Sequence, residues 1–469
     1  MLAPCLPGMK SLGFIVLAVL AGTLFSAATE AQDQLDHRPP TIVDEEFVLD
    51  RLALGSCCQQ SKPVPTTDLI GKSNADLFLW LGDNIYGDTN DMQVLVDKYQ
   101  QLADRSEYQR LVEAMPVIAT WDDHDFGVND GGREYPHKIA SKNVMLDFFD
   151  EPTDSQRRER SGIYTSYLLG PAEKQVHIIL PDLRTFRSKV PTRKEVPYKN
   201  MGHYREDTEG EMLGDEQWEW LEEQLQVDSR IKIIGMSTQF VQHGNGFEAW
   251  ANMPRQQKKL VDLIRKYKTE GVLFVSGDTH WTEVSCLESD GVYPLFDFTA
   301  SSLNQHWEPA ANTVRVGPAY GHPNYSLLNI DWEQSDPLIQ FQSFDIENKK
   351  QVDISIRLGQ LTFDDSNLNL SPLENIEGAW ESSEGKIEFI QDEEKMEWIA
   401  RYSGGSCRLT RNGDRLSGTW TETGKTEPSG TCSFALYRDS RFVRGTYSLG
   451  MEKAEILAWP CWNKRGDDE

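Results

Sequence analysis

The residues Leu77-Phe78-Leu79-Trp80-Leu81-Gly82-Asp83-Asn84-Ile85-Tyr86 decide the fold, because an apolar run passes directly into a polar cluster. Five consecutive apolar residues bounded by a turn are typical of a strand that is buried on both faces. Gly82 allows a sharp backbone turn at the strand end, so Asp83 is expected to point out of the sheet edge. We therefore interpret residues 77–81 as a buried strand and residues 82–86 as a candidate ligand loop.

The same change from apolar to polar residues recurs along the chain. Further strands are expected at 52–54, 117–120, 176–180, 231–236 and 272–275. The polar clusters that follow them are Ser56-Cys57, Asp122-Asp123-His124-Asp125, Asp182-Leu183-Arg184, Ser237-Thr238-Gln239 and Asp278-Thr279-His280. Strands of this kind, alternating with helices, predict an α/β fold whose polar clusters gather at the carboxyl ends of the strands.

Helices are expected between several of these strands, at residues 92–112, 214–227 and 254–268. The third begins with Pro254, whose missing N–H is tolerated in the first turn of a helix. Residues 338–358 resemble a hairpin that turns near Asn348. Residues 359–373 are interpreted as a linker, and residues 374–469 as a small antiparallel β domain, either a barrel or a sandwich.

The bulk composition limits the function classes. The chain has 469 residues, which suggests two or three domains, and a net charge of −27. Stable binding to DNA or RNA is excluded, because such proteins normally carry a basic face. The charge also repels phosphorylated substrates at long range, so a phosphate site here would need local cations such as metal ions.

The N-terminus has the pattern of a secretory signal peptide over residues 1–31. Lys10 supplies a positive charge, residues 12–25 form a short apolar run, and small residues up to Ala31 offer cleavage sites. The prediction is a secreted or periplasmic protein without an integral membrane span after cleavage; an uncleaved anchor is the alternative. In such a compartment, one pair among Cys407, Cys432 and Cys461 is expected to form a disulfide.

The acidic clusters have the chemistry of a metal centre. Asp122, Asp123, His124 and Asp125 place three carboxylates and an imidazole in four positions, and they repel one another unless a cation lies among them. The alternative is a polar loop that caps a helix. Asp83 can bridge two metal ions and a phenolate of Tyr86 suits a trivalent metal, although a capped turn with a packed tyrosine explains the same residues.

The remaining candidates leave their alternatives open. Asp278 and His280 can project toward two adjacent metal ions. The Cys57 thiolate is a good soft ligand, but a disulfide is equally compatible with the sequence. Arg184 can bind phosphate through two parallel hydrogen bonds or form a salt bridge. His124 can steady the phosphate or protonate the leaving group.

Taken together, these motifs resemble the PhoD-like (alkaline phosphatase D) family over about residues 48–330. The motifs are Gly55-Ser56-Cys57, Leu81 to Tyr86, Trp121 to Asp125 with Asn129, Asp182-Leu183-Arg184 and Ser276 to His280. This family belongs with the calcineurin-like metallophosphoesterases. The resemblance implies a four-layer α/β/β/α sandwich over residues 32–358, followed here by the small all-β domain.

The resemblance also implies a dinuclear metal centre, with Fe³⁺ and Ca²⁺, or with Zn²⁺, Mn²⁺ or Mg²⁺. It implies metal ligands at Cys57, Asp83, Tyr86, Asp123, Asn129, Asp278 and His280, and catalytic roles for His124, Asp123 and Arg184. Gln239 lies where purple acid phosphatases have a histidine. The chain lacks room for the N-terminal β domain of longer family members, and the family core does not include residues 374–469.

The leading hypothesis is a secreted, metal-dependent phosphoesterase that hydrolyses phosphate monoesters, diesters or both. A hydrolase of the same fold with a shifted substrate is the second hypothesis. The third is an extracytoplasmic binding or adhesion protein whose metal core is structural. Turnover of a phosphate ester by the mature protein separates the first hypothesis from the other two.

Overall fold

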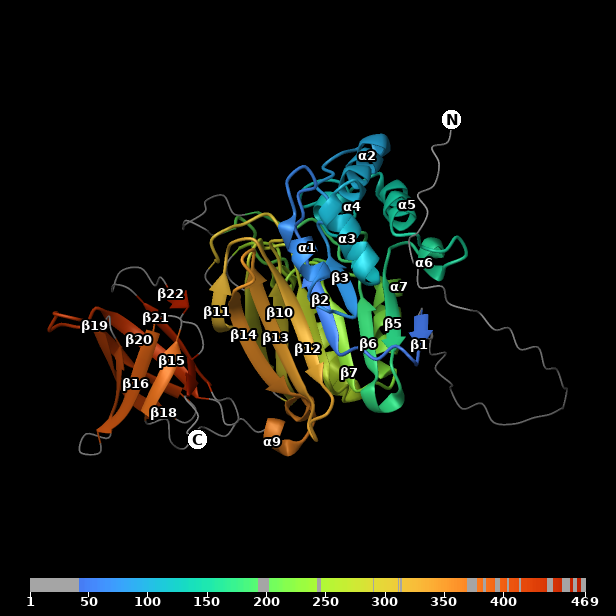
Figure 1. Ribbon diagram of the computed structural model, residues 1–469. Helices are drawn as coiled ribbons and strands as arrows, with labels where there is room; N and C mark the ends of the chain where they lie inside the picture. Colours follow the sequence, from blue (N-terminus) through green and yellow to red (C-terminus); the bar gives the residue numbers. More distant parts are fainter. Residues whose placement is uncertain are drawn as a thin grey trace, which may run out of the picture.

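The computed structural model describes most of the chain from Ile42 onward. The described residues are 42–192, 202–242, 246–289, 291–310, 312, 314–368, 378–382, 385–392, 397–402, 405–412, 415–436, 442–448, 456–458 and 462–464. Two mixed sheets form the centre of the α/β part, and a wholly antiparallel sheet follows toward the C-terminus (Figure 1). The signal peptide expected at residues 1–31 lies outside the described residues.

A six-stranded sheet has the strand order β14-β13-β12-β2-β3-β4. Its strands are β2 (Arg51–Gly55), β3 (Leu77–Leu81), β4 (Val117–Thr120), β12 (Asn324–Asp331), β13 (Leu338–Asp345) and β14 (Lys350–Arg357). Strands β2, β3 and β4 are parallel, with Leu52 opposite Leu77 and Phe78 opposite Val117. The residues that follow these three strands therefore emerge at one edge of the sheet.

The second sheet has eight strands in the order β1-β5-β6-β7-β8-β10-β9-β11. They are β1 (Ile42–Asp44), β5 (Thr165–Leu169), β6 (Val176–Leu180), β7 (Ile231–Gly235), β8 (Val272–Ser276), β9 (Thr282–Ser289), β10 (Val292–Ala300) and β11 (Arg315–Tyr320). Strands β6, β7, β8 and β10 are parallel neighbours. Every strand expected from the apolar runs is present in one of the two sheets.

The alternating side chains of β3 explain the layered architecture. Leu77, Leu79 and Leu81 belong to the large core that also contains strands of the eight-stranded sheet. Phe78 and Trp80 belong to a second core, beneath the helices that cover the other face of the six-stranded sheet. Because both faces of β3 are buried, its sequence is a continuous apolar run.

Helices cover the outer face of each sheet. Helices α1 (Pro65–Gly71), α2 (Met92–Ala103), α3 (Ser106–Ala114) and α5 (Lys138–Phe148) contribute buried residues to the core around Phe78 and Trp80. Helices α7 (Asp215–Gln226) and α8 (Pro254–Tyr267) pack on the eight-stranded sheet. The protein therefore has the α/β fold that the strand pattern predicts and the four-layer α/β/β/α sandwich that the family resemblance implies.

One expected helix is divided in two. The sequence predicts a single helix over residues 92–112, whereas α2 ends at Ala103 and α3 begins at Ser106. Arg105 between them has an extended backbone, with φ −71° and ψ 121°. Its Nε donates a hydrogen bond to the Gln60 carbonyl at 2.8 Å, which helps to hold the break in place.

Short elements complete the α/β part of the chain. They are α4 (Asp123–Phe126), α6 (Gln156–Glu159), α9 (Asp365–Leu368) and the 3₁₀ turns Ala172–Lys174, Trp250–Asn252 and Leu358–Leu361. The last turn and α9 lie within the segment that the sequence assigns to a linker, so part of this segment is helical. The expected hairpin is formed by β13 and β14, and Asn348 in its turn has a positive φ of 61°.

The antiparallel sheet closes on itself. Its strands are β15 (Gly378–Ser382), β16 (Gly385–Asp392), β17 (Glu397–Tyr402), β18 (Gly405–Asn412), β19 (Arg415–Glu422), β20 (Gly430–Leu436), β21 (Phe442–Ser448), β22 (Ile456–Ala458) and β23 (Trp462–Lys464). Consecutive strands from β15 to β21 pair with each other, and β23 pairs with both β21 and β15. These pairings make a closed barrel, with Phe389, Trp398 and Leu409 among its buried residues.

The described cysteines are free thiols. Cys57, Cys58, Cys286, Cys407 and Cys432 are all buried. Cys407 and Cys432 are therefore not bonded to each other, although a disulfide among the three C-terminal cysteines is expected from the sequence. Cys461 lies outside the described residues.

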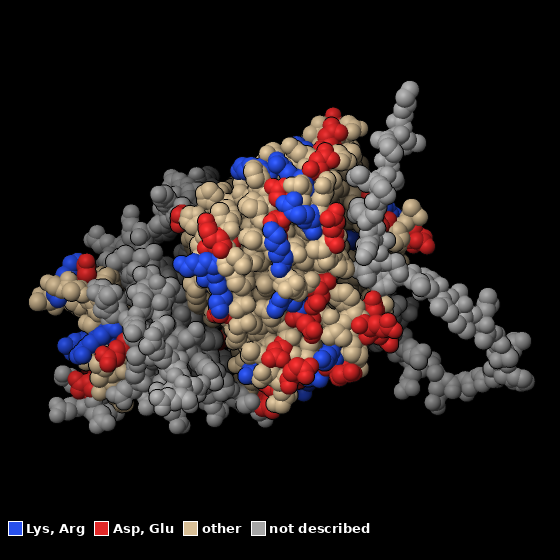
Figure 2. All heavy atoms as spheres, in the orientation of Figure 1, with Lys and Arg blue, Asp and Glu red and all other residues tan. Residues whose placement is uncertain are grey.

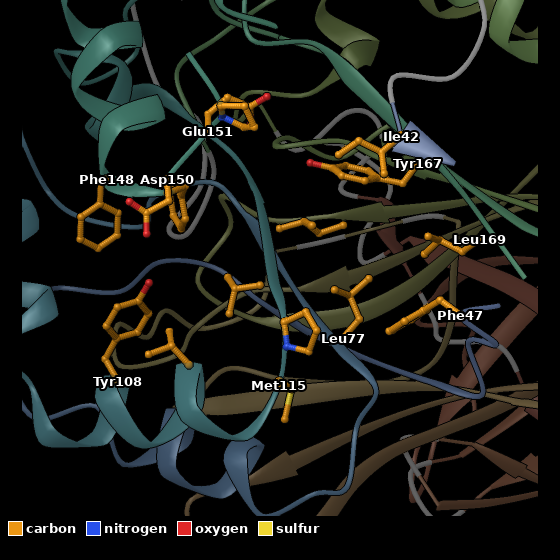
Figure 3. Close-up of a pocket in the computed structure, with 16 residues that line it drawn as sticks. Ile42, Phe47, Leu77, Tyr108, Met115, Phe148, Asp150, Glu151, Tyr167 and Leu169 are labelled. Atoms are coloured by element: carbon orange, nitrogen blue, oxygen red, sulfur yellow. The ribbon is translucent and has the colours of Figure 1, made fainter. Parts of the chain in front are cut away.

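An apolar cavity of about 260 Å³ lies at the amino ends of β3 and β4 (Figure 3). Leu77 and Val117, the first residues of these strands, line it together with Tyr108 and Phe148 from the helical layer. The clusters that contain Asp83 and Asp123 follow the opposite ends of the same strands. The cavity is therefore separate from the candidate site described below.

The visible surface carries mixed charge. On the face shown in Figure 2, acidic and basic side chains are interspersed over the α/β part. This face does not carry the continuous basic surface that a nucleic-acid backbone would require. As far as the structure describes the chain, none of its helices has both the length and the hydropathy that crossing a bilayer requires.

Candidate metal centre

The candidate centre lies where the carboxyl ends of strands from the two sheets meet. Cys57 follows β2, Asp83 follows β3 and Asp123 begins α4 directly after β4. Asp278 and His280 follow β8 of the facing sheet. Parallel strands that end at a common edge thus bring together residues that are more than 200 positions apart in the chain.

The backbone at this site is strained. Cys57, Asp83, Asp278 and His280 have positive φ angles of 60°, 50°, 69° and 61°. A non-glycine residue in a sparsely populated region of this kind costs about 1–3 kcal/mol, and such residues cluster at functional sites. Gly82 has φ 93°, and a Cβ atom added to it would lie 2.5 Å from the Cβ of Asp122. Only glycine fits at that position.

The first group of ligand atoms combines sulfur, nitrogen and oxygen. Cys57, Asp83 and His280 have ligand atoms that all lie within 4.8 Å of one another. The Cys57 Sγ lies 3.5 Å from the Asp83 Oδ2 and 3.0 Å from the Ser301 Oγ. The Tyr86 hydroxyl lies 3.4 Å from the same carboxylate oxygen and 2.8 Å from the His280 Nε2.

The second group contains only carboxylates. Asp83, Asp122, Asp123 and Asp278 again have ligand atoms within 4.8 Å of one another. Burial, followed by the charges of neighbouring groups, raises the pKa of Asp83 and of Asp278 well above the usual range. Asp83 belongs to both groups and therefore links them.

The arrangement fits two metal ions of different character. Burial raises the pKa of the Cys57 thiol to about 12 and that of the Tyr86 hydroxyl well above its usual value, so both need a cation to ionise at neutral pH. Within the described part of the chain, the buried oxygens Asp83 Oδ1 and Asp122 Oδ2 lack a hydrogen-bond partner. Thiolate, imidazole and phenolate suit a transition metal, whereas an all-carboxylate group suits a hard cation.

His124 lies beside both ligand groups, and it forms a further group with Asp83 and Asp123 whose ligand atoms also lie within 4.8 Å of one another. Its Nδ1 is 2.8 Å from the Asp88 Oδ1, and its ring centroid is 4.1 Å from that of Tyr86. Burial by itself lowers the pKa of His124, but the carboxylates of Asp83, Asp123 and Asp88 outweigh this and raise it to about 10. In the metal-free protein the imidazole is therefore held as a cation, with its Nδ1 engaged by Asp88.

Arg184 is enclosed by carboxylates. Its Nε donates to the Asp122 Oδ1 at 2.6 Å and its Nη1 to the Glu248 Oε2 at 2.6 Å, and the side chain is fully buried. Its Nη2 lies 3.9 Å from the Asp123 Oδ1. The sequence allowed either a salt bridge or phosphate binding for Arg184, and these contacts are salt bridges. The guanidinium also lies next to the carboxylate cluster.

Two further sequence candidates have different surroundings. Asn129 is exposed, and its amide Nδ2 donates to the Asp130 Oδ2 at 2.7 Å. Gln239 is buried, and its amide donates to the Glu283 Oε1 at 2.7 Å and to the Thr299 Oγ1 at 2.9 Å. These contacts give the amide nitrogen of each residue an acceptor within the protein.

Several residues of the site were not singled out by sequence reasoning. Asp122 was recognised only as part of its motif, although its position next to Asp123 was a signal. Glu248, which forms a second all-carboxylate group with Asp123 and Asp130, lies on a loop after β7 without a motif. Ser301, which binds the Cys57 thiol and accepts the His280 N–H at 2.7 Å, follows β10 and carries no distinctive signal.

Comparisons with known proteins found a family match and similar solved structures. A family model described as PhoD-like phosphatase matches residues 54–355. The solved structures similar to this chain include one titled "Structure of PhoD", at 15% sequence identity and a TM-score of 0.48. That match covers 66% of this chain and 72% of the other. No curated protein matches this sequence.

Proposed function

Because the chain belongs to the PhoD-like phosphatase family, we propose that it is an exported, metal-dependent phosphoesterase that hydrolyses phosphate monoesters, diesters or both. The observation that carries the proposal is the pair of ligand groups that share Asp83. Export rests on the N-terminal sequence pattern. On this proposal residues 32–358 form the catalytic domain, residues 359–373 a linker and residues 374–469 a separate β domain.

The two ligand groups would hold two metal ions. Cys57, Tyr86 and His280 would bind one, Asp123 and Asp278 the other, and Asp83 would bridge them, with Asn129 nearby. Two such ions clamp the phosphate oxygens and activate the attacking water. The donor types favour Fe³⁺ in the first position and Ca²⁺ in the second, and Zn²⁺, Mn²⁺ and Mg²⁺ are the alternatives.

His124 is proposed as the proton donor to the leaving oxygen. Asp88, which is not among the proposed metal ligands, raises the pKa of His124 and so favours the protonated imidazole in the metal-loaded protein. Since Asp88 engages the Nδ1, the Nε2–H is the group left to donate. A positioned acid of this kind contributes about 10²–10⁴-fold to the rate.

Arg184 is proposed to act through the carboxylates beside it. By holding Asp122 and Glu248, it fixes the acidic cluster that contains Asp123 and Asp278. Its Nη2 is the one guanidinium nitrogen without a hydrogen bond, and its charge lies 3.9 Å from the Asp123 Oδ1, where it helps to hold this carboxylate ionised. Asp123 itself would contribute by binding the second metal ion.

The test is hydrolysis of a nitrophenyl phosphate monoester and of the matching diester by the mature, metal-loaded protein. We expect turnover of at least one ester and its loss in Asp83→Asn, which keeps the shape of the side chain and removes the shared ligand charge. The ratio of the two rates defines the substrate class. Elemental analysis of the same samples identifies the metals and shows whether the variant has lost them.

Two results would contradict the proposal. If the metal-loaded wild type hydrolyses neither ester, the centre serves a shifted substrate or a structural role. If Asp83→Asn loses its metals but keeps full turnover, the reaction takes place elsewhere. Treatment with a chelator followed by readdition of single metals then separates a catalytic ion from a structural one.

A further inference from the structure

An exposed aromatic residue lies beside the candidate centre. Trp307 has 51% of its surface exposed. Among the residues that the structure describes, the other exposed large hydrophobic side chains are aliphatic: Val43, Val94, Val96, Ile139 and Ile346. An exposed aromatic side chain next to a candidate site is available to contact a substrate, and an aromatic ring offers a large contact area for binding.

Trp307 is in direct contact with His280, a candidate metal ligand. Its backbone N–H donates to the His280 carbonyl at 3.1 Å, and its ring centroid is 5.4 Å from that of His280 at an interplanar angle of 74°. Phe247 contacts Trp307, with ring centroids 5.5 Å apart. These two side chains form an aromatic wall next to His280.

The loop that carries Trp307 is held in place at several points. Asn304 accepts the Gln59 N–H at 2.7 Å and donates to the Gln59 carbonyl at 3.0 Å. Lys62 donates to the Gln305 side chain at 2.9 Å. Both partners lie just after Cys57, so the loop is fixed to the same part of the chain that supplies a candidate ligand.

The neighbouring turn also packs tightly against this loop. A Cβ atom added to Gly321 would lie 2.2 Å from the Trp307 carbonyl oxygen, so the two backbones are in close contact. The aromatic wall is therefore organised before any substrate binds. Such preorganisation lowers the entropic cost of binding.

We propose that the wall formed by Trp307 and Phe247 binds an aromatic ring in the alcohol part of the substrate. The preferred substrates are then aryl or nucleoside phosphate esters. This inference rests on the proposed function, because a phosphate bound at the metal centre places the alcohol part within reach of the wall. Stacking on an aromatic side chain does not depend on charge, which suits a chain with a net charge of −27.

The kinetic test compares esters with and without a ring. For the wild type, Trp307→Leu and Trp307→Phe, kcat/KM is measured with phenyl phosphate, adenosine 5′-phosphate and glycerol phosphate. We expect Trp307→Leu to lower the ratio of ring-bearing to ring-free kcat/KM about tenfold, mainly through KM, and Trp307→Phe to restore part of it. Ile139→Ala, at an equally exposed site in α5, is the matched control and should leave the ratio unchanged.

The two ring-bearing esters distinguish the sources of the ring. If Trp307→Leu lowers kcat/KM selectively for adenosine 5′-phosphate, the wall binds nucleoside phosphates. If it lowers kcat/KM selectively for phenyl phosphate, the wall binds aryl phosphates. If the ratio is unchanged for both esters, the inference is wrong. The same conclusion follows if all three esters slow equally, because Trp307 would then only support His280.

A binding measurement separates this inference from the proposed function. Calorimetric titration with phenylphosphonate and methylphosphonate, which are not esters and cannot be hydrolysed, needs no turnover. The wild type should bind the phenyl compound about tenfold more tightly, and Trp307→Leu should bind both alike. If the wild type binds phenylphosphonate selectively but hydrolyses no ester, the proposed phosphoesterase function is wrong and the aromatic wall is supported. If it hydrolyses esters but binds the two phosphonates alike, the proposed function is supported and the aromatic wall is wrong.

Discussion

At the scale of single residues, the requirements of stability and of function conflict at Asp83. It is buried, it has a left-handed backbone, and its carboxylate lies among those of Asp122, Asp123 and Asp278. In the metal-free protein we expect Asp83→Asn to raise the free energy of unfolding by about 1–2 kcal/mol, because it removes a carboxyl group that must be either protonated or buried as a like charge, while asparagine tolerates the backbone. Urea unfolding after chelation measures this.

Asp125 provides the matched control for that prediction. It is equally buried and belongs to the same motif, but its carboxylate accepts the backbone N–H groups of Asp122 at 2.7 Å and Asn84 at 3.2 Å. Asp125→Asn should therefore lower the free energy of unfolding by about 1–2 kcal/mol. A shift in the same direction for both variants would show that like-charge repulsion is not the cause.

The contact between Asp88 and His124 leads to a prediction about how turnover depends on pH. If His124 donates a proton, turnover falls as pH rises through its pKa in the enzyme–substrate complex. Asp88→Asn removes a charge that raises the pKa of His124, so the basic limb of the kcat profile should move down by about one pH unit. Asp91→Asn, which changes only the capping residue of α2, should leave the profile in place.

At the scale of elements, the end of β3 depends on a glycine. Gly82→Ala places a methyl group 2.5 Å from the Cβ of Asp122 at φ 93°, whereas Gly424 has a similar φ of 86° with no atom within 4 Å of the added carbon. We expect Gly424→Ala to cost about 1–2 kcal/mol from the backbone alone. Gly82→Ala should cost clearly more and abolish turnover, as measured by chemical unfolding of each domain. Equal costs would show that the contact with Asp122 relaxes freely.

The sequence predicted the strands of the sandwich because apolar runs such as residues 77–81 are buried on both faces. It could not predict the break between α2 and α3, since the contact between Arg105 and the Gln60 carbonyl is tertiary. The clustering of Cys57, Asp83, Asp123, Asp278 and His280 follows from their places at strand ends. Glu248 and Trp307 could not be found in this way, because loops carry no periodicity and their contacts form only in the folded chain.

At the scale of the whole molecule, a buried pair in the eight-stranded sheet makes stability depend on pH. His177 lies opposite Lys232, and burial, together with the charge of Lys232, lowers the pKa of His177 to about 3. The unfolded chain, with a histidine pKa of about 6.5, then binds more protons than the folded protein between pH 3 and 6.5. Stability should therefore fall as pH falls through this window.

The size of this effect can be measured by substitution. At pH 5 the wild type should have lost about 2 kcal/mol through His177 relative to pH 7. Urea unfolding of His177→Leu should lack this part of the pH dependence, whereas His137→Gln, at an exposed histidine, should retain it. If the stability of His177→Leu depends on pH as strongly as that of the wild type, groups other than His177 take up the protons.

The closed barrel has a consequence for how the chain is made. Strand β15 is the first strand of the barrel to leave the ribosome, yet one of its two neighbours is β23, the last of the described strands. Until β23 emerges, the growing sheet has an open edge with unpaired N–H and C=O groups, and an edge of this kind can pair with another nascent chain. A premature stop shortly before Trp462 would therefore leave a permanently unpaired edge, although all the other strands of the barrel had been made.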